Sequence, residues 1–465
     1  MKKSTISKVA ATTLVAAMAA GMLAGCGSST TSTTTTTTTT ADETGSDDAA
    51  EATTDDGSVD TSEMTAKAEE MGAQYEGEDV SLTFWYLSTR SNSQAICDVW
   101  NAANPNMQVT LSTFDTDGIK DNCKTATQSG SMPSMWFNWG GALGQYYVDE
   151  GVTYDITDYL DEHGLTETIN SGALSLCQLS GTTAGYPTSY NVLGMFYRTD
   201  IFEQYGIEVP TTMDEFTAAC ATLKENGITP LTTAGLNGWH VMRLIEQFIE
   251  YEAGAELHDE LQALTASWDC DAVVNALTTY QEYCQAGYFP DGFVTASPDD
   301  VYIAFAQGIC AMDIQGQWYD GTLRGNEISL DNVGWFPFPN GTGRMSAFAE
   351  MTQFNANLTD DELDAAMLFT QYWFSNEVAR VYSADFNLPL PYTYADPVNE
   401  DDNPHVQEML DYSSENGTFT ITDQAFPTQV ADVLFSYQDA IANGEATPEE
   451  AAPAIQAAID EYLAQ

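Results

Sequence analysis

The sequence predicts an α/β protein in which helices and mainly parallel strands alternate along the chain. Two observations carry this prediction. Short segments rich in β-branched and aromatic residues alternate with longer segments of helical periodicity, as in βαβ units. Several helical segments begin with a Thr-x-x-Glu capping box, which marks a helix start. With 465 residues, the chain is also long enough for two domains, each with its own core.

The first run of elements lies between residues 80 and 139. Strands are predicted at 80–87, 107–114 and 133–139, and helices at 95–103 and 116–128. Asn104-Pro105 ends the first helix, because the residue before a proline is disfavoured in helical geometry. Strands separated by helices of this length predict a parallel sheet.

The same alternation resumes in the second half. Capping boxes at 212–215, 359–362 and 447–450 predict helices that run to Glu225, to about Phe374 and to about Leu463. A further helix is predicted at 271–286, where Gly287 ends it, and a buried strand at 309–314.

The N-terminus has the pattern of a secretory signal peptide. Basic residues at 2, 3 and 8 precede an uncharged apolar stretch at 9–22. The Leu-Ala-Gly-Cys ending at 23–26 resembles a bacterial lipoprotein signal. That resemblance implies a signal peptide at 1–25, lipid on Cys26, and anchoring to the outer face of the cytoplasmic membrane. Ordinary secretion with an incidental thiol at Cys26 is the alternative.

Residues 26–78 are predicted to form a disordered tether. An unbroken threonine run at 33–40 leads into an acidic stretch with almost no large apolar residues. Such a segment cannot bury enough surface to offset the entropy of folding. The pattern leaves room for one short helix near 64–74.

The charge balance excludes some partners. The chain has 13 Lys and Arg against 69 Asp and Glu, a formal net charge of −56. This charge repels nucleic acid and anionic lipid, and it argues weakly against an anionic ligand.

The sequence lacks the usual markers of cofactor and metal sites. It has no Cys-x-x-Cys pair, no phosphate-binding glycine loop and no His-Glu-x-x-His motif. Its four histidines are scattered, so we expect no metal and no cofactor. One disulfide, between Cys97 and Cys123, remains an open alternative to free thiols.

Several stretches together resemble a known family. They lie, in order, at 84–86, 100–105, 130–134, 185–187, 197–202, 210–216, 224–230, 305–312 and 316–318, and include Trp-Asn-Ala-Ala-Asn-Pro, Pro-Thr-Thr-Met-Asp-Glu-Phe and Gly-Gln-Trp. The chain resembles the carbohydrate-binding family of extracellular solute-binding proteins of ABC importers, which includes maltose-binding protein. Met213 stands where tryptophan is usual in that family.

The resemblance implies a two-lobe periplasmic-binding-protein-like fold of type II. One lobe would comprise 79–191 and 339–375, and the other 192–338 and 376–465. Three crossings would form the hinge, near Asn191, 335–338 and 375–382. It also implies a monomer that catalyses nothing, binds a sugar or oligosaccharide between the lobes and delivers it to ABC membrane subunits.

A sugar site needs aromatic plates and hydrogen-bonding side chains around a concave pocket. The candidate ligand-binding residues are Trp318, Trp239, Trp139, Asn138, Tyr190, Asn191, Glu350, His240, Arg90, Ser88 and Asn387. The resemblance implies that Trp318 stacks on sugar and that the loop before Trp239 reaches the ligand. Trp85, Trp100, Trp136, Trp268 and Trp373 are interpreted as core.

Two other functions are compatible with the residues alone. The same fold could hold a polyamine or another cationic solute between aromatic walls and acidic groups. A surface glycoside hydrolase would need only two suitably spaced carboxylates, which 69 acidic residues can always supply.

Overall fold

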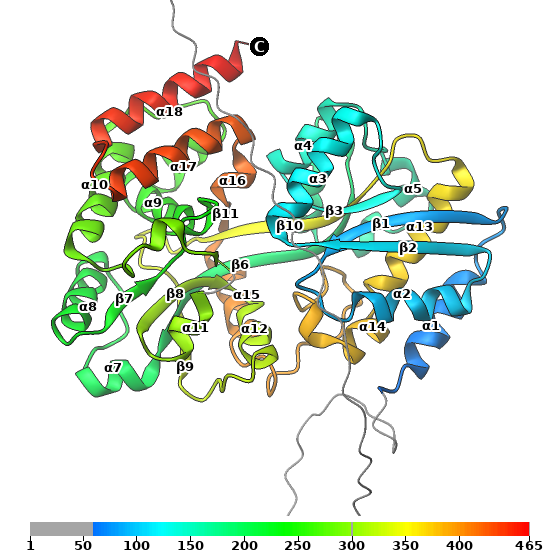
Figure 1. Ribbon diagram of the computed structural model, residues 1–465, viewed down its shortest axis with the longest axis horizontal. Coiled ribbons are helices and arrows are strands. Elements are labelled where there is room, and N and C mark those ends of the chain that lie inside the picture. The colour runs from blue at the N-terminus through cyan, green and yellow to red at the C-terminus, as the bar shows by residue number, and fades with distance from the viewer. Residues whose placement is uncertain (1–58, 299–300, 465) are drawn as a thin grey trace, which may run out of the picture. The chain divides into compact units, whose positions relative to one another are not determined.

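A computed structural model describes residues 59–298 and 301–464 of the chain. The predicted signal peptide, Cys26 and most of the predicted tether lie outside the described residues. The described part consists of two lobes, each with helices packed around strands and each with its own hydrophobic cluster (Figure 1). The predicted α/β class and two-lobe architecture are confirmed.

One sheet path runs through both lobes. Its strand order is β2-β1-β3-β10-β6-β8-β7, with β11 beside β10 and β9 beside β6. The strands are β1 Val80–Leu87, β2 Met107–Phe114, β3 Met135–Trp139, β6 Tyr186–Arg198, β7 Thr229–Thr232, β8 Cys310–Gly316, β9 Val333–Phe336, β10 Met345–Phe354 and β11 Thr418–Thr420; β4 Gln178–Leu179 and β5 Thr182–Thr183 form a separate hairpin. The predicted parallel pairing holds for β1 with β2 and β3, and for β7 with β8.

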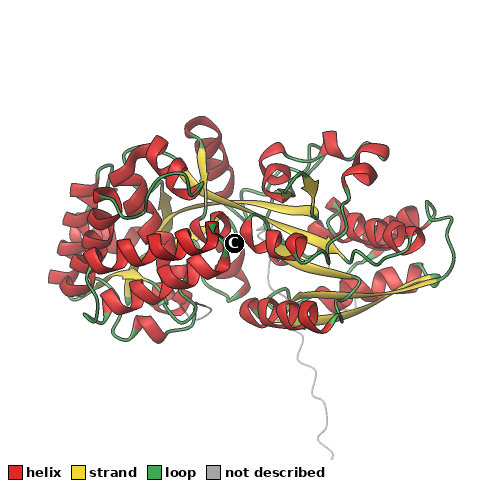
Figure 2. Ribbon diagram, turned by 90° about the horizontal axis from the view of Figure 1, so that it is seen from above, coloured by secondary structure: helices red, strands yellow, loops and turns green. Residues whose placement is uncertain are grey.

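Helices cover both sides of the strands (Figure 2). Those of the first lobe are α1 Ser62–Gly72, α2 Ser93–Ala103, α3 Thr116–Ser129, α4 Ala142–Asp149, α5 Thr157–Glu162, α6 Ser171–Cys177, α13 Asp360–Trp373 and α14 Asn376–Val381. Those of the second lobe are α7 Thr199–Tyr205, α8 Met213–Glu225, α9 Trp239–Gln262, α10 Asp271–Ala286, α11 Val301–Ala306, α12 Tyr319–Gly325, α15 Val406–Asn416, α16 Thr422–Ala425, α17 Thr428–Ala442 and α18 Pro448–Leu463. Both capping-box hydrogen bonds are present at α13 and α18.

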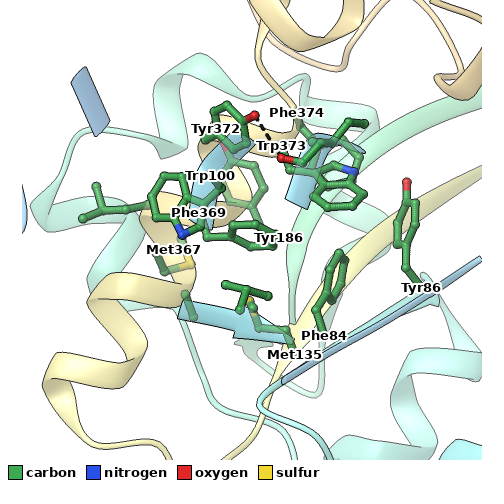
Figure 3. Close-up of a cluster of buried hydrophobic side chains, with 14 of the residues drawn as sticks. Phe84, Tyr86, Trp100, Met135, Tyr186, Met367, Phe369, Tyr372, Trp373 and Phe374 are labelled. Carbon is green, nitrogen blue, oxygen red and sulfur yellow. Dashed lines mark hydrogen bonds between the residues drawn. The ribbon is translucent and has the colours of Figure 1, made fainter. Parts of the chain in front are cut away.

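Aromatic side chains fill the core of the first lobe (Figure 3). The ring of Phe84 on β1 meets Trp373 edge-on at 5.3 Å between centroids, and Trp100 meets Phe369 at 5.4 Å. The core prediction is confirmed for Trp100, Trp136, Trp268 and Trp373, which are buried; Trp85 is only half-buried but packs against the same core cluster as Trp100. Edge-on pairs of this kind add to the hydrophobic gain of burial.

Three connections join the lobes, but two lie elsewhere than predicted. The first is β6, which passes Asn191 as expected, because Tyr186 belongs to the core of the first lobe and Leu193 to that of the second. The second is β10, rather than residues 335–338: β9 still pairs with β6 in the second lobe. Both strands run between the lobes in Figure 1.

The third connection also differs from the prediction. Residues 376–392 were assigned to the second lobe, but Val378, Tyr382 and Tyr392 pack into the core of the first. Asp396 still pairs with Arg380 of α14, whereas Asp402 pairs with Arg324 of the second lobe. The chain therefore crosses between 396 and 402, not near 375–382.

The N-terminal boundary of the first lobe is earlier than predicted. Helix α1 lies within the segment predicted as tether and packs against α2, α13 and α14. Its side chains Met64, Ala68 and Met71 are buried, and Arg380 of α14 forms an ion pair with Glu63. The first lobe therefore includes residues 62–72, which precede the predicted boundary at 79.

Replacing Met64 with alanine is expected to lower the free energy of unfolding by about 2 kcal/mol, because its buried side chain leaves a cavity under α1. Urea denaturation followed by circular dichroism measures the change. Glu69→Ala on the exposed face of the same helix is the control and should stay within about 0.5 kcal/mol of the parent protein. Equal stability of both variants would mean that α1 is not part of the cooperative fold.

All seven cysteines of the described residues are free thiols, so the Cys97–Cys123 disulfide is absent. Burial raises the pKa of both thiols to about 12, and they act as small apolar core residues.

Candidate functional site

A cavity of about 560 Å³ lies between the lobes. Its lining comes from the loop after β1, the end of β3, the start of α9, the end of β8, α12, β10 and the turn at 384–387. The volume is within the range of small-molecule sites. Two smaller hollows, of about 60 and 230 Å³, share Lys120 and Trp239 with each other and continue the cavity toward α16 and α17.

Tryptophans from both lobes form the walls. Trp139 ends β3 in the first lobe, Trp239 begins α9, and Trp318 follows β8 in the second lobe. Phe348 of β10 contacts the Trp318 ring at 5.5 Å between centroids. All three predicted tryptophans therefore line one cavity, as an aromatic site requires.

Glycines shape the two turns that carry the second-lobe tryptophans. A Cβ atom on Gly316 would lie 1.9 Å from the six-membered ring of Trp318, so this ring position requires glycine at the end of β8. Gly238 has φ of +77° and abuts Phe435, which fixes the start of α9. A side chain at either position would displace a cavity wall.

Each of these tryptophan rings has a cation of the protein over it. The Arg243 guanidinium lies 4.6 Å from the Trp239 ring centroid and 5.4 Å from that of Trp318. The Lys120 ammonium lies 4.8 Å from the Trp139 ring centroid. Burial lowers the pKa of Arg243 to about 10, despite opposing carboxylates that include Asp423, so this side chain stays charged at neutral pH.

A polar network forms another part of the cavity wall. Arg90 Nη2 donates to Asn387 Oδ1 at 2.9 Å, and Asn387 Nδ2 donates to Glu350 Oε2 at 3.2 Å. Ser189 on β6 also donates to Glu350, and Asn191 donates to Ser189. Burial raises the pKa of Glu350, while the charge of Arg90 and these hydrogen bonds oppose the rise.

Five predicted site residues, including Asn138, do not line this cavity. His240 is fully buried in the second lobe, 3.3 Å from the Asp313 carboxylate. Tyr190 lines separate grooves and bonds to Thr418. Ser88 is exposed beside the lining residues Leu87 and Thr89, and Asn191 reaches the wall only through Ser189.

Asn138, predicted to bind the ligand, is buried within β3 instead of lining the 560 Å³ cavity. Residues 135–138 are all buried, because β3 is covered on both faces. The Asn138 amide donates to Gln353 at 2.6 Å, and the residue lines only the 230 Å³ hollow.

The sequence interpretation did not include several polar lining residues, among them Arg243, Gln315 and Asp423. Arg243 lies one helical turn after Trp239, a spacing that places both on one face of α9. Gln315 accepts a hydrogen bond from Arg243 at 3.1 Å. Asp423, on α16, has a buried carboxylate oxygen with no partner in the described residues, and burial raises its pKa. Only the Trp239–Arg243 spacing was visible in the sequence.

Comparison with known proteins identifies the family. The model for bacterial extracellular solute-binding proteins matches residues 87–380. The chain belongs to this family. This solute-binding protein is 24% identical over 297 residues to the multiple sugar-binding protein of Streptococcus mutans, an alignment that spans 60% of this chain and 67% of that one. An uncharacterized ABC transporter extracellular-binding protein of Pyrococcus horikoshii is 24% identical over 151 residues, 32% of this chain and 34% of its own length.

Solved structures share the fold of this solute-binding protein. A chitin oligosaccharide binding protein aligns with a TM-score of 0.74 and 22% identity, covering 82% of this chain and 98% of that one. A maltose-bound protein of T. maritima aligns with a TM-score of 0.70 and 18% identity, covering 82% and 99%.

The part of the chain that the structure describes contains neither a metal-binding cluster nor a membrane-spanning helix. Within residues 59–298 and 301–464, no group of three or more His, Cys, Asp or Glu side chains is arranged to hold a metal ion. No helix in these ranges is long and apolar enough to cross a membrane.

Proposed function

We propose that this solute-binding protein captures a sugar or oligosaccharide between its lobes and delivers it to the membrane subunits of an ABC importer. It acts as a monomer held at the outer face of the cytoplasmic membrane by lipid on Cys26, and it catalyses no reaction. The observation that carries the proposal is one cavity that joins three tryptophans to an Arg90–Asn387–Glu350 network. Tryptophan faces suit the CH faces of sugars, and the polar groups suit hydroxyls.

The cavity argues against a cationic ligand such as a polyamine. Each of its three tryptophan rings already has Lys120 or Arg243 of the protein over it. A cationic ligand would be repelled by these charges at the aromatic surfaces that should attract it. A hydrolase is disfavoured because the family consists of solute-binding proteins.

A thermal-shift screen tests the proposal. The protein is heated with neutral and acidic mono- and oligosaccharides, polyamines and peptides. A saccharide at about 100 times its dissociation constant should add about 2.7 kcal/mol of stability and raise Tm. Stabilisation by polyamines or peptides, with no response to any saccharide, would reject the proposed ligand class. Each saccharide that binds is then incubated with the protein and analysed by chromatography. It should be recovered intact, because we propose that the protein catalyses no reaction.

A further inference from the structure

Two arginines of the cavity differ from the others in the chain. All six arginines lie in the described residues, and Arg198, Arg324, Arg344 and Arg380 each have an Asp or Glu oxygen within 4.0 Å. The ion pairs of the described residues include neither Arg90 nor Arg243, although the chain has 69 acidic residues. The two exceptions line the same cavity.

Both guanidinium groups also retain unused hydrogen-bonding capacity. The Nε atoms of Arg90 and Arg243 are buried and have no partner in the described residues. Arg243 is only 7% exposed, so water satisfies little of this capacity. Leaving a buried charged donor unpaired costs free energy, which a complementary ligand group would recover.

We propose that the ligand is an acidic saccharide whose carboxylate, as in a uronic acid residue, binds to Arg243 and Arg90 in the interlobe cavity. This inference rests on the proposed function. Guanidinium and carboxylate are both planar and can form two parallel N–H···O bonds, a match that ammonium or hydroxyl groups lack. The Arg243 guanidinium lies over the rings of Trp239 and Trp318, and its Nη1 donates to Gln315, so these contacts hold it at the cavity wall.

The strongly negative chain does not rule out such a ligand. Charges on the distant surface are screened over about 8–10 Å at physiological salt, whereas buried pairs are screened much less. Glu350 and Asp423 also line the cavity or its extension, and burial raises the pKa of both carboxyl groups. Glu350 already accepts hydrogen bonds from Ser189 and Asn387, and these bonds stabilise its carboxylate within the protein.

Calorimetric titration with matched disaccharides tests the inference. Each neutral disaccharide, such as galactobiose or cellobiose, is compared with the uronic acid disaccharide of the same linkage and stereochemistry, and with a sulfated form. For the pair that fits the cavity, we expect the uronate to bind at least tenfold more tightly than its neutral counterpart. Arg243→Gln and Arg90→Gln should each reduce that preference to about twofold or less.

Controls separate binding from folding and from net charge. Lys224→Gln removes one positive charge from an exposed position on α8 and should leave the preference unchanged. Thermal melts without ligand identify a variant that fails to fold. If Arg243→Gln fails to fold, Arg243→Lys replaces it. This variant keeps the positive charge but lacks the paired N–H donors of the guanidinium, so it should lose most of the preference for the uronate.

The possible outcomes distinguish the two proposals. Equal or tighter binding of the neutral sugars overturns the acidic-ligand inference and leaves the sugar-binding function intact. Tighter binding of the sulfated form overturns the carboxylate assignment. A response to no saccharide overturns the sugar-binding function and the inference with it. An unchanged preference in folded arginine variants also overturns the inference, because the selectivity would then arise elsewhere.

Discussion

Replacing Arg344 with methionine is expected to lower the free energy of unfolding by about 3–5 kcal/mol, because it leaves a buried carboxylate with fewer partners. Arg344 stands just before β10 and donates to both oxygens of Glu250 on α9, at 2.8 and 2.9 Å. Glu250 is fully buried and is also 2.5 Å from His258. Urea denaturation measures the loss.

Arg380→Met is the matched control. Arg380 also forms carboxylate pairs, with Glu63 and Asp396, but about half of its side chain is exposed. Exposed ion pairs contribute about 0–1 kcal/mol, so this variant should be much less destabilised than Arg344→Met. Equal losses of stability in the two variants would show that burial does not determine how much the Arg344–Glu250 ion pair contributes to the free energy of unfolding.

The contacts of Glu250 with Arg344 and His258 also make the stability of the fold depend on pH. Burial alone would raise the pKa of Glu250, but hydrogen bonds from His258, Arg344 and Thr342 outweigh it and lower the pKa to about 2. A carboxyl group with a depressed pKa stabilises the fold above its ordinary pKa of about 4.5. This contribution should fall as the pH drops toward 2, and Arg344→Met should show a shallower fall over that range.

Local patterns were sufficient for most of the strands and helices. Residues 80–87 and 107–114 are strands as predicted, because runs of β-branched and aromatic residues suit a half-buried sheet. The boxes at Thr359 and Thr447 begin helices because side chain and backbone satisfy each other there. These features depend on neighbours within a few residues, so one sequence reveals them.

Long-range partners could not be read in this way. Val378 and Tyr382 are apolar enough for either core, and only tertiary packing assigns them to the first lobe. His240 and Trp239 are adjacent on α9, yet Trp239 lines the cavity while His240 turns toward buried Asp313. Arg90, Glu350 and Asn387 were identified singly; the hydrogen bonds that unite them join distant parts of the chain.

Trp318→Ala is expected to weaken saccharide binding by about 2–3 kcal/mol, roughly 30- to 150-fold, while the ligand-free protein melts within a few degrees of the parent. The half-buried indole contacts Phe348 and Arg243 at the cavity wall, so its loss removes stacking area from the ligand but little from the lobe core. Titration calorimetry with the saccharide found in the thermal-shift screen measures the affinity.

Two further variants test whether a loss of affinity in Trp318→Ala comes from the indole at the cavity wall or from removing any tryptophan of the second lobe. Trp335→Ala removes another half-buried tryptophan of the second lobe, which donates to Glu408 away from the cavity, and should bind normally. Gly316→Ala keeps the indole but pushes its ring from the observed position, because the new Cβ would lie 1.9 Å from it. We therefore expect Gly316→Ala to weaken binding as Trp318→Ala does. Normal affinity in both Gly316→Ala and Trp318→Ala would remove Trp318 from the ligand site, since neither the ring nor its position would then matter.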